Sequence, residues 1–322
     1  MTHSPHASDL LTHSGGPKAG TEGTRFGFFT DTSVCIGCKA CEVACKEWNG
    51  VPAREDSDFT GTSMDNTGAL GADTWRHVAF IEQPAPTDQA WDGRVGLEWF
   101  GEDPGLPAGA HGAELGVVPE FNGEAAPAGE HSFRWLMSSD VCKHCTHAAC
   151  LEVCPTGAIF YTEFQTVVVQ DDVCNGCGYC VTACPYGVIE RRSPGQPGGG
   201  GAFKCTLCYD RMCGQQQPAC AQACPTDSIQ FGPLEELRER ASVRADELIE
   251  AGVPGVQLYG HGDDGVGGNG AFFLLLDDPE VYGLPPDPVT PTRNLGEIWS
   301  WAGAAAVGLV AAIGGALLGG RR

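Results

Sequence analysis

Basic residues are scarce in this chain of 322 residues. Lys and Arg number 19 against 41 Asp and Glu, which gives a formal net charge of −22 at pH 7. Nucleic-acid-binding proteins rely on basic surfaces, so this balance argues against a nucleic-acid partner. It favours proteins as partners instead.

The sequence shows neither a signal peptide nor a catalytic motif. The first 23 residues contain neither an apolar run nor a twin arginine, so no signal peptide is visible, and we expect a disordered tail over residues 1–25. We also find no nucleophile–base set, nucleotide-binding loop or substrate-pocket motif. These absences favour a protein that does not itself catalyse a reaction.

Cysteine, in contrast, is abundant, with 17 in the chain. Residues 174–185 read Cys-Asn-Gly-Cys-Gly-Tyr-Cys-Val-Thr-Ala-Cys-Pro, which is the spacing of a bacterial [4Fe–4S] ligand run. A cubane cluster needs four thiolates. The loop can surround three corners, while the fourth cysteine, on a short helix, reaches a neighbouring cluster.

The same kind of spacing occurs three more times, so that 16 of the 17 cysteines fall into four tetrads. The tetrads are Cys35, Cys38, Cys41 and Cys45; Cys142, Cys145, Cys150 and Cys154; Cys174, Cys177, Cys180 and Cys184; and Cys205, Cys208, Cys220 and Cys224. Zinc sites usually consist of separated C-x-x-C pairs, and cysteines three apart on a tight loop rarely form disulfides. The pattern therefore predicts four [4Fe–4S] clusters.

Some residues near the tetrads leave alternatives open. Cys213 lies five residues after Cys208 and could replace Cys220 as a ligand. We favour Cys220, because its spacing to Cys224 repeats the end of the other tetrads. Rieske-type ligation by His144 or His147 is conceivable, but their tetrad already has four cysteines, which favours packing or hydrogen bonding.

The order of the tetrads predicts an α+β fold of two nested ferredoxin-like units. The second and third tetrads flank a hairpin expected at residues 158–162 and 165–169, which is the plan of a two-cluster ferredoxin. The first and last tetrads have no partner nearby in sequence, so we expect them to pair in space. The boundaries are an outer unit at 26–49 and 202–232, an insertion at 50–132, an inner unit at 133–193, a C-terminal helix, strand and arm at 233–296, and a membrane segment at 297–322.

Other elements follow from local patterns. We expect strands at residues 26–30, 75–81, 95–100, 133–137 and 271–276, a helix at 40–48, a flexible link at 194–201 and an extended arm at 279–291. We expect Trp75, Trp99 and Trp135 to serve in core or interface packing. An amphipathic helix is predicted with one apolar face formed by Leu234, Leu237, Ala241, Ala245, Leu248 and Ile249.

Residues 298–320 form an uncharged run of 23, followed by two arginines. As a helix this run spans about 35 Å, enough for a hydrocarbon core of about 30 Å. Trp299 and Trp301 lie at one edge, as interfacial aromatics do, and the terminal arginines favour a cytoplasmic C-terminus with the cluster domain outside the cytoplasm. Ala311, Gly315 and Gly319 indicate packing on another membrane helix. The alternative is a soluble helix rich in Ala and Gly.

The cysteine motifs resemble the four-cluster beta subunits of molybdopterin oxidoreductases. The similarity is carried by residues 142–150, 174–180, 204–211 and 218–226. Within that group, residues 34–49, 258–260 and 278–286 and the single C-terminal helix are most similar to the iron–sulfur subunit of membrane-bound formate dehydrogenase. The resemblance covers residues 26–320, while the tail and Cys213 have no counterpart in the pattern.

The resemblance implies a crossed ligation, in which each loop of three cysteines receives its fourth ligand from another tetrad. The implied ligand sets are Cys35, Cys38, Cys41 and Cys224 for cluster 1; Cys45, Cys205, Cys208 and Cys220 for cluster 2; Cys142, Cys145, Cys150 and Cys184 for cluster 3; and Cys154, Cys174, Cys177 and Cys180 for cluster 4.

The resemblance also implies an electron-transfer role. Electrons are expected to pass from a molybdopterin-containing catalytic subunit, with molybdenum or tungsten, to an integral membrane cytochrome b or quinone-binding subunit. The alternatives are the same role beside a hydrogenase or a sulfur-compound oxidoreductase, or a free polyferredoxin. A zinc-stapled structural module is a further, colourless alternative.

Overall fold

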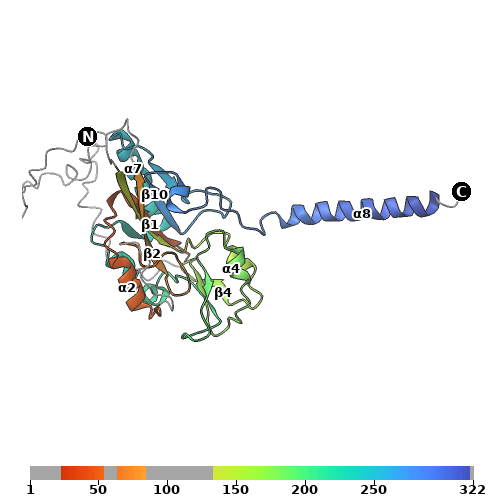
Figure 1. The fold of residues 1–322 in the computed structure, drawn as a ribbon, viewed down its shortest axis with the longest axis horizontal. Coiled ribbons are helices and arrows are strands. Elements are labelled where there is room, and N and C mark those ends of the chain that lie inside the picture. The colour runs from red at the N-terminus through yellow and green to blue at the C-terminus, as the bar shows by residue number, and fades with distance from the viewer. Residues whose placement is uncertain (1–22, 54–63, 85–132, 320–322) are drawn as a thin grey trace, which may run out of the picture. The chain divides into compact units, whose positions relative to one another are not determined.

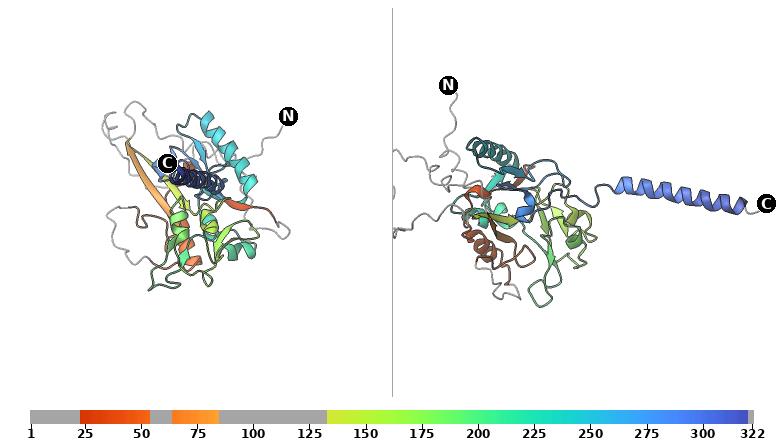
Figure 2. Two further views of the ribbon diagram at one scale, coloured as in Figure 1. Left: turned by 90° about the vertical axis from the view of Figure 1, so that its right-hand side faces the viewer. Right: turned by 45° about the horizontal axis from the view of Figure 1, so that its top comes forward.

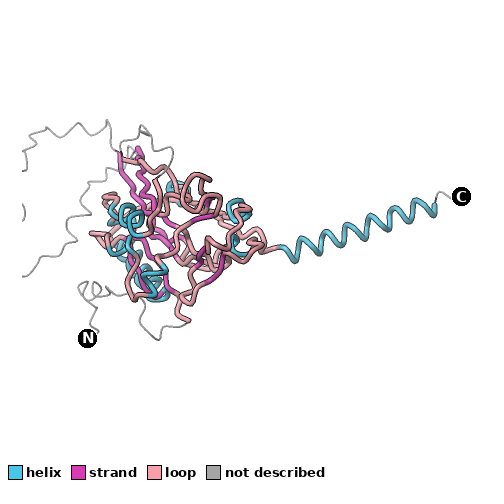
Figure 3. The backbone as a smooth tube through the Cα atoms, turned by 90° about the horizontal axis from the view of Figure 1, so that it is seen from below, coloured by secondary structure: helices cyan, strands magenta, loops and turns pink. Residues whose placement is uncertain are grey.

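The structure is a computed structural model that describes residues 23–53, 64–84 and 133–319. Residues 1–22 of the expected tail, the strand expected at 95–100 and Trp99 lie outside these ranges. At the end of the expected tail, Arg25 Nη2 donates a hydrogen bond of 2.8 Å to the His144 carbonyl oxygen, so this residue is held by the folded chain. The chain divides into two compact units, Met1–Ala79 with Met137–Arg322, and Phe80–Leu136. Helices and strands are mixed and are linked by many loops and turns (Figures 1 and 3).

The first unit contains a four-stranded sheet in the order β8-β1-β10-β9. Its strands are β1 (Phe26–Asp31), β8 (Ile229–Pro233), β9 (Gln257–Tyr259) and β10 (Ala271–Leu275). β1 is parallel to β10 and antiparallel to β8, and β10 is antiparallel to β9. Every residue of β1 and β10 is buried, which explains the apolar run over all of β10 and over Phe26–Phe29 of β1. The sheet matters for the site because β1 leads into the first cysteine tetrad and β8 follows the last.

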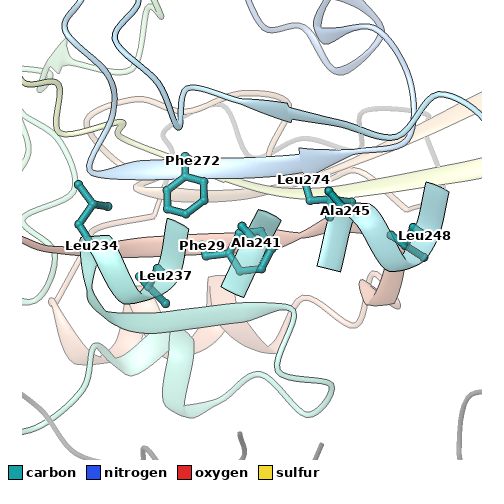
Figure 4. Close-up of a cluster of buried hydrophobic side chains, with 8 residues drawn as sticks. All are labelled: Phe29, Leu234, Leu237, Ala241, Ala245, Leu248, Phe272 and Leu274. Carbon is teal, nitrogen blue, oxygen red and sulfur yellow. The ribbon is translucent and has the colours of Figure 1, made fainter. Parts of the chain in front are cut away.

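Helix α7 (Leu234–Glu250) packs on this sheet through one apolar face (Figure 4). Phe29 of β1 and Phe272 of β10 stack with ring centroids 5.3 Å apart, and both belong to the core cluster that α7 helps to form. The expected apolar face is confirmed except at Ile249, which is 57% exposed. The correction has a geometric reason: a residue directly after the buried Leu248 lies about 100° further around the helix.

Five short helices follow the cysteine loops. They are α2 (Ala40–Trp48), α3 (Ala149–Glu152), α4 (Tyr179–Ala183), α5 (Tyr209–Cys213) and α6 (Ala219–Gln222). The loops before α2, α4 and α5 end in left-handed residues, namely Lys39, Gly178 and Cys208. Gly176 is also left-handed, and a Cβ there would lie 2.2 Å from the carbonyl oxygen of Gly200. The third loop therefore requires a glycine at this position.

The remaining sheets each have two strands. They are β2 (Arg76–Pro84) with β3 (Phe133–Val141), β4 (Ile159–Tyr161) with β5 (Val167–Val169), and β6 (Glu190–Arg191) with β7 (Ala202–Phe203). The β4–β5 pair confirms the predicted hairpin between the second and third tetrads. Residues 194–201, expected to be a flexible link, instead form a series of hydrogen-bonded turns that closes the β6–β7 pair.

The two remaining tryptophans differ in their surroundings. Trp75 is half-buried, and its ring nitrogen donates a hydrogen bond of 3.0 Å to the Ala72 carbonyl oxygen. Trp135, in the Phe80–Leu136 unit, is 39% exposed and so is not a core residue of the described chain, while its packing at an interface stays a prediction. Within that unit Arg134 Nε donates to Gln83 Oε1 at 2.9 Å, which links the ends of β3 and β2.

Two 3₁₀ turns and one long helix complete the described chain. The turns are η1 (Thr32–Val34) and η3 (Pro279–Tyr282), so the arm expected at 279–291 begins with a helical turn rather than as an extended segment. The helix is α8 (Leu295–Gly319). In length and composition its residues Leu295–Gly314 can cross a membrane, and none of this apolar window is buried within the chain. Figure 2 shows α8 as one continuous helix. Among the described residues, α8 is the only helix that is both long enough and apolar enough to cross a membrane.

Candidate metal centres

The first and last tetrads, 160 residues or more apart in sequence, lie side by side in space. Helix α2, which carries Cys41 and Cys45, contacts helix α6, which carries Cys220. The Asn49 side-chain nitrogen lies 3.7 Å from Cys45 Sγ and 3.7 Å from Cys208 Sγ. The two sulfur atoms can therefore be no further apart than twice that distance. The antiparallel pairing of β1 with β8 holds these two segments together.

The thiols of this outer region influence one another. Burial raises the pKa of the Cys35 thiol, and the neighbouring Cys224 adds to this effect. Burial also raises the pKa of Cys45 well above its usual value, with further contributions from Cys205, Cys220 and Cys208. The neighbouring thiols that raise the pKa of Cys45 thus belong to the last tetrad, while the nearby Arg76 lowers it.

The inner tetrads surround a small apolar core. Ile159, Val167 and Ile189 belong to this core, and cysteines from both tetrads pack against it. Helix α3 of the second tetrad contacts helix α4 of the third. A cavity in this region is lined by four cysteines, namely Cys142, Cys145, Cys150 and Cys184. Three of these come from the second tetrad and one from the third.

The same mixing is visible in the pKa values of the inner thiols. Burial raises the pKa of Cys150 to about 12, with contributions from Cys142 and Cys184. Burial raises the pKa of Cys180 to about 11, and the neighbouring Cys174, Cys177 and Cys154 contribute as well. Because iron binds the thiolate, cluster assembly must remove protons that these buried sites hold tightly, and metal binding is thereby coupled to proton release.

Buried cations accompany the cysteines. Arg76 and Lys204 are each 2% exposed, and neither forms a salt bridge with a carboxylate among the residues described. Arg76 Nη2 donates to Cys220 Sγ at 3.2 Å. Lys204 Nζ donates to the carbonyl oxygens of Val167 and Cys205. A buried charge needs a countercharge, and a thiolate-bound iron–sulfur cluster is anionic, so these residues fit the group that the cysteines predict.

Cys213, His144 and His147, for which the sequence leaves alternatives open, lie in different surroundings. Cys213 is exposed, with its sulfur 3.9 Å from Glu163 Oε1. His144 is buried, and its Nδ1 accepts a hydrogen bond of 3.1 Å from the Val167 N–H. Burial and the nearby Lys204 hold the pKa of His144 well below its usual value, so the ring is neutral. The predicted packing and hydrogen-bonding role of His144 is confirmed. The backbone N–H of His147 donates a hydrogen bond of 2.7 Å to the Val266 carbonyl oxygen.

Sequence reasoning missed several polar residues around the cysteines. Ser139 Oγ lies 3.2 Å from Cys41 Sγ, and Arg76 and Asn49 also reach cysteine sulfur atoms. Arg76 belongs to a segment predicted only as a strand, and no local signal marks it as a neighbour of the cysteines. Across residues 23–53, 64–84 and 133–319, no three Cys, His, Asp or Glu side chains converge closely enough to hold a single metal ion.

Paired cysteine-rich loops, short helices and a small β-hairpin between them define an iron–sulfur protein with a ferredoxin-like domain. The sequence agrees: residues 133–234 match the 4Fe-4S dicluster domain family. The chain is 33% identical over 293 residues to the Escherichia coli iron–sulfur subunit of nitrate-inducible formate dehydrogenase, covering 88% of this chain and 81% of the relative. It is 34% identical over 276 residues to the Haemophilus influenzae formate dehydrogenase iron–sulfur subunit, covering 84% of this chain and 72% of the relative.

Similarity extends more weakly to a second group. A subunit of the Escherichia coli anaerobic dimethyl sulfoxide reductase is 32% identical over 217 residues, covering 67% of this chain and 78% of the relative. The protein belongs to the family of formate dehydrogenase iron–sulfur subunits. It is an electron-transfer subunit that binds multiple [4Fe–4S] clusters, as the cysteine spacing predicts.

Proposed function

We propose that the chain holds four [4Fe–4S] clusters and passes electrons from a molybdopterin-containing formate dehydrogenase catalytic subunit to an integral membrane cytochrome b or quinone-binding subunit. The observation that carries this proposal is the convergence of four cysteine tetrads into neighbouring sets. Each bound cluster supplies one-electron redox chemistry, while the protein sets potentials through burial, hydrogen bonds to sulfur and nearby charge.

The proposed ligation is crossed. Cys224 completes the loop of Cys35, Cys38 and Cys41, and Cys45 completes the set of Cys205, Cys208 and Cys220. In the inner pair, Cys184 joins Cys142, Cys145 and Cys150, and Cys154 joins Cys174, Cys177 and Cys180. The Asn49 contacts to Cys45 and Cys208 support the second set, and the four cysteines lining the inner cavity are those of the third.

The proposed domain organisation follows from this ligation. An outer dicluster unit at residues 26–49 and 202–232 encloses an inner dicluster unit at 133–193, with the insertion at 50–132 between them. Residues 233–296 support the outer unit through α7 and β10, which share its core. The chain itself catalyses no reaction, and formate oxidation takes place in its partner.

We further propose that α8 anchors the chain as a single-pass membrane helix with the cluster domain outside the cytoplasm. The length and exposed apolar surface of α8 support the anchor, and the terminal arginines support the orientation. Protease added to intact spheroplasts should then digest the cluster domain. Full protection would reverse the proposed orientation.

The electron-transfer path is tested with the complex that copurifies with the full chain. Formate added under anaerobic conditions should reduce the clusters of this chain, as followed by EPR, and the copurified large subunit should contain molybdopterin. The dimethyl sulfoxide reductase relatives favour a second candidate, the equivalent subunit of a sulfoxide reductase. In that case formate leaves the clusters oxidised, and dimethyl sulfoxide reoxidises clusters that have been reduced chemically.

A further inference from the structure

Arg76 lies between two sets of cysteines. It begins β2, in the segment that separates the first and second tetrads. Its Nη2 donates to Cys220 Sγ at 3.2 Å, and its Nη1 donates to the carbonyl and hydroxyl oxygens of Ser139 at 3.1 and 3.3 Å. Ser139 Oγ is in turn 3.2 Å from Cys41 Sγ. One guanidinium thus contacts a cysteine of the last tetrad directly and one of the first tetrad through a single hydroxyl group.

Lys204 likewise lies between cysteines of two tetrads, the second and the last. It lines the inner cavity together with Cys142 and Cys150, and its ammonium group also donates to the carbonyl oxygen of Cys205 at 3.0 Å. Lys204 therefore contacts the second and last tetrads together.

We propose that Arg76 and Lys204 are shared countercharges, each placed between two successive clusters. Arg76 serves clusters 1 and 2, and Lys204 serves clusters 2 and 3. Each is a positioning residue that raises the midpoint potentials of both clusters beside it. Cluster 2 is the only cluster served by both cations.

The physical reason is the charge of the reduced cluster. Reduction adds one electron, and hence one negative charge, to a cluster that is already anionic. A fixed cation in a buried, low-dielectric site stabilises the reduced form more than the oxidised form, which raises the midpoint potential. The electron arrives from one neighbouring redox centre and leaves to the next, and the cation itself exchanges no proton. A cation between two clusters raises both potentials together.

The inference rests on the proposed function, because it requires the clusters to be bound. It does not depend on which cysteine crosses between loops. Cys41 and Cys220 belong to different clusters whether ligation is crossed or local, and the same is true of Cys142 and Cys205. Failure of the crossed ligation would therefore leave this inference standing.

The test uses the full chain with its copurifying partners and measures midpoint potentials by EPR-monitored redox titration. The variants are Arg76→Met and Lys204→Met, which remove the charge, and Arg76→Lys and Lys204→Arg, which keep it. Arg192→Met is the matched control: Arg192 is also a buried arginine, it stacks on Phe203 at 3.5 Å, and its hydrogen bonds go to carbonyl oxygens of Pro197 and Ala72. Cluster signals are assigned with Cys→Ser variants of each loop.

Arg76→Met should lower the potentials of clusters 1 and 2, and Lys204→Met those of clusters 2 and 3. At fixed potential we expect at least a tenfold fall in the ratio of reduced to oxidised cluster, which is about 59 mV for a one-electron couple. The charge-keeping variants and Arg192→Met should shift the ratio by much less. Unshifted potentials in both methionine variants, or equal shifts in all four clusters, would overturn the inference.

Loss of iron in a methionine variant also has a defined meaning. If Arg76→Met loses iron, the midpoint potentials of Lys204→Met decide whether the inference stands. If both methionine variants lose iron, the charge-keeping variants decide: full iron content in them supports the countercharge role, and equal loss in them overturns it. A parent protein with fewer than four clusters would refute the proposed function before any variant is compared. A parent with four clusters and unshifted variants would refute only this inference.

Discussion

Substituting Cys45 by serine tests the crossed ligation most sharply. Cys45 lies at the end of the first tetrad in sequence, but its neighbouring thiols are Cys205, Cys220 and Cys208. Asn49 contacts the sulfur atoms of both Cys45 and Cys208 at 3.7 Å. Serine is a harder and poorer ligand for cluster iron than cysteine, so the cluster that uses Cys45 should be damaged first.

The expected size of the effect follows from burial and stoichiometry. Cys45 is only 5% exposed, so solvent has little access to supply a replacement ligand. Loss of one iron leaves about 15 of about 16 iron atoms per chain, and loss of the whole cluster leaves about 12. The other three cluster signals should keep their intensity, so the change is confined to about a quarter of the EPR signal.

The assay compares EPR spectra during redox titration of Cys45→Ser, Cys35→Ser and Cys205→Ser. The crossed ligation requires Cys45→Ser and Cys205→Ser to alter the same signal. Cys213→Ser is the matched control, because this exposed cysteine should leave all four signals unchanged. If Cys45→Ser instead shares its altered signal with Cys35→Ser, the outer tetrads bind their clusters locally and the reasoning is refuted.

Two further predictions concern the core and the anchor. Phe272→Ala should lower the free energy of unfolding by about 3–5 kcal/mol in a denaturant titration, because the ring is fully buried against Phe29. Val243→Ala on the exposed side of α7 should change it by less than about 0.5 kcal/mol, and equal effects would contradict the packing of α7 on the sheet. Removing residues 295–322 should release the separately expressed chain from the membrane fraction with its iron content unchanged; continued membrane binding would show that another surface holds it.

Elements with a strong local pattern were predictable from the sequence. The bounds of α2 agree with the expected helix at residues 40–48, and α7 includes all six residues of the predicted apolar face, from Leu234 to Ile249. The hairpin β4–β5 was predicted because two short apolar runs flank a turn. The cysteine positions were visible because ligand spacing in such loops is fixed by the size of the cluster.

Long-range arrangements were less accessible. The parallel pairing of β1 with β10 joins Phe28 to Ala271, and no local pattern encodes such a contact. The same holds for Arg76, whose segment predicts only a strand although its guanidinium lies beside Cys220. The spacing of cysteines along the chain predicts the cluster ligands, whereas only the folded chain reveals the charges and hydrogen bonds around them.

The most direct test of the account is the metal and sulfide content of the purified full chain. Four complete tetrads predict about 16 iron atoms and about 16 acid-labile sulfides per chain. Anaerobically purified protein should contain both in these amounts and little zinc. About eight iron atoms in fully reconstituted protein, or zinc in place of iron, would contradict the four-cluster electron-transfer chain.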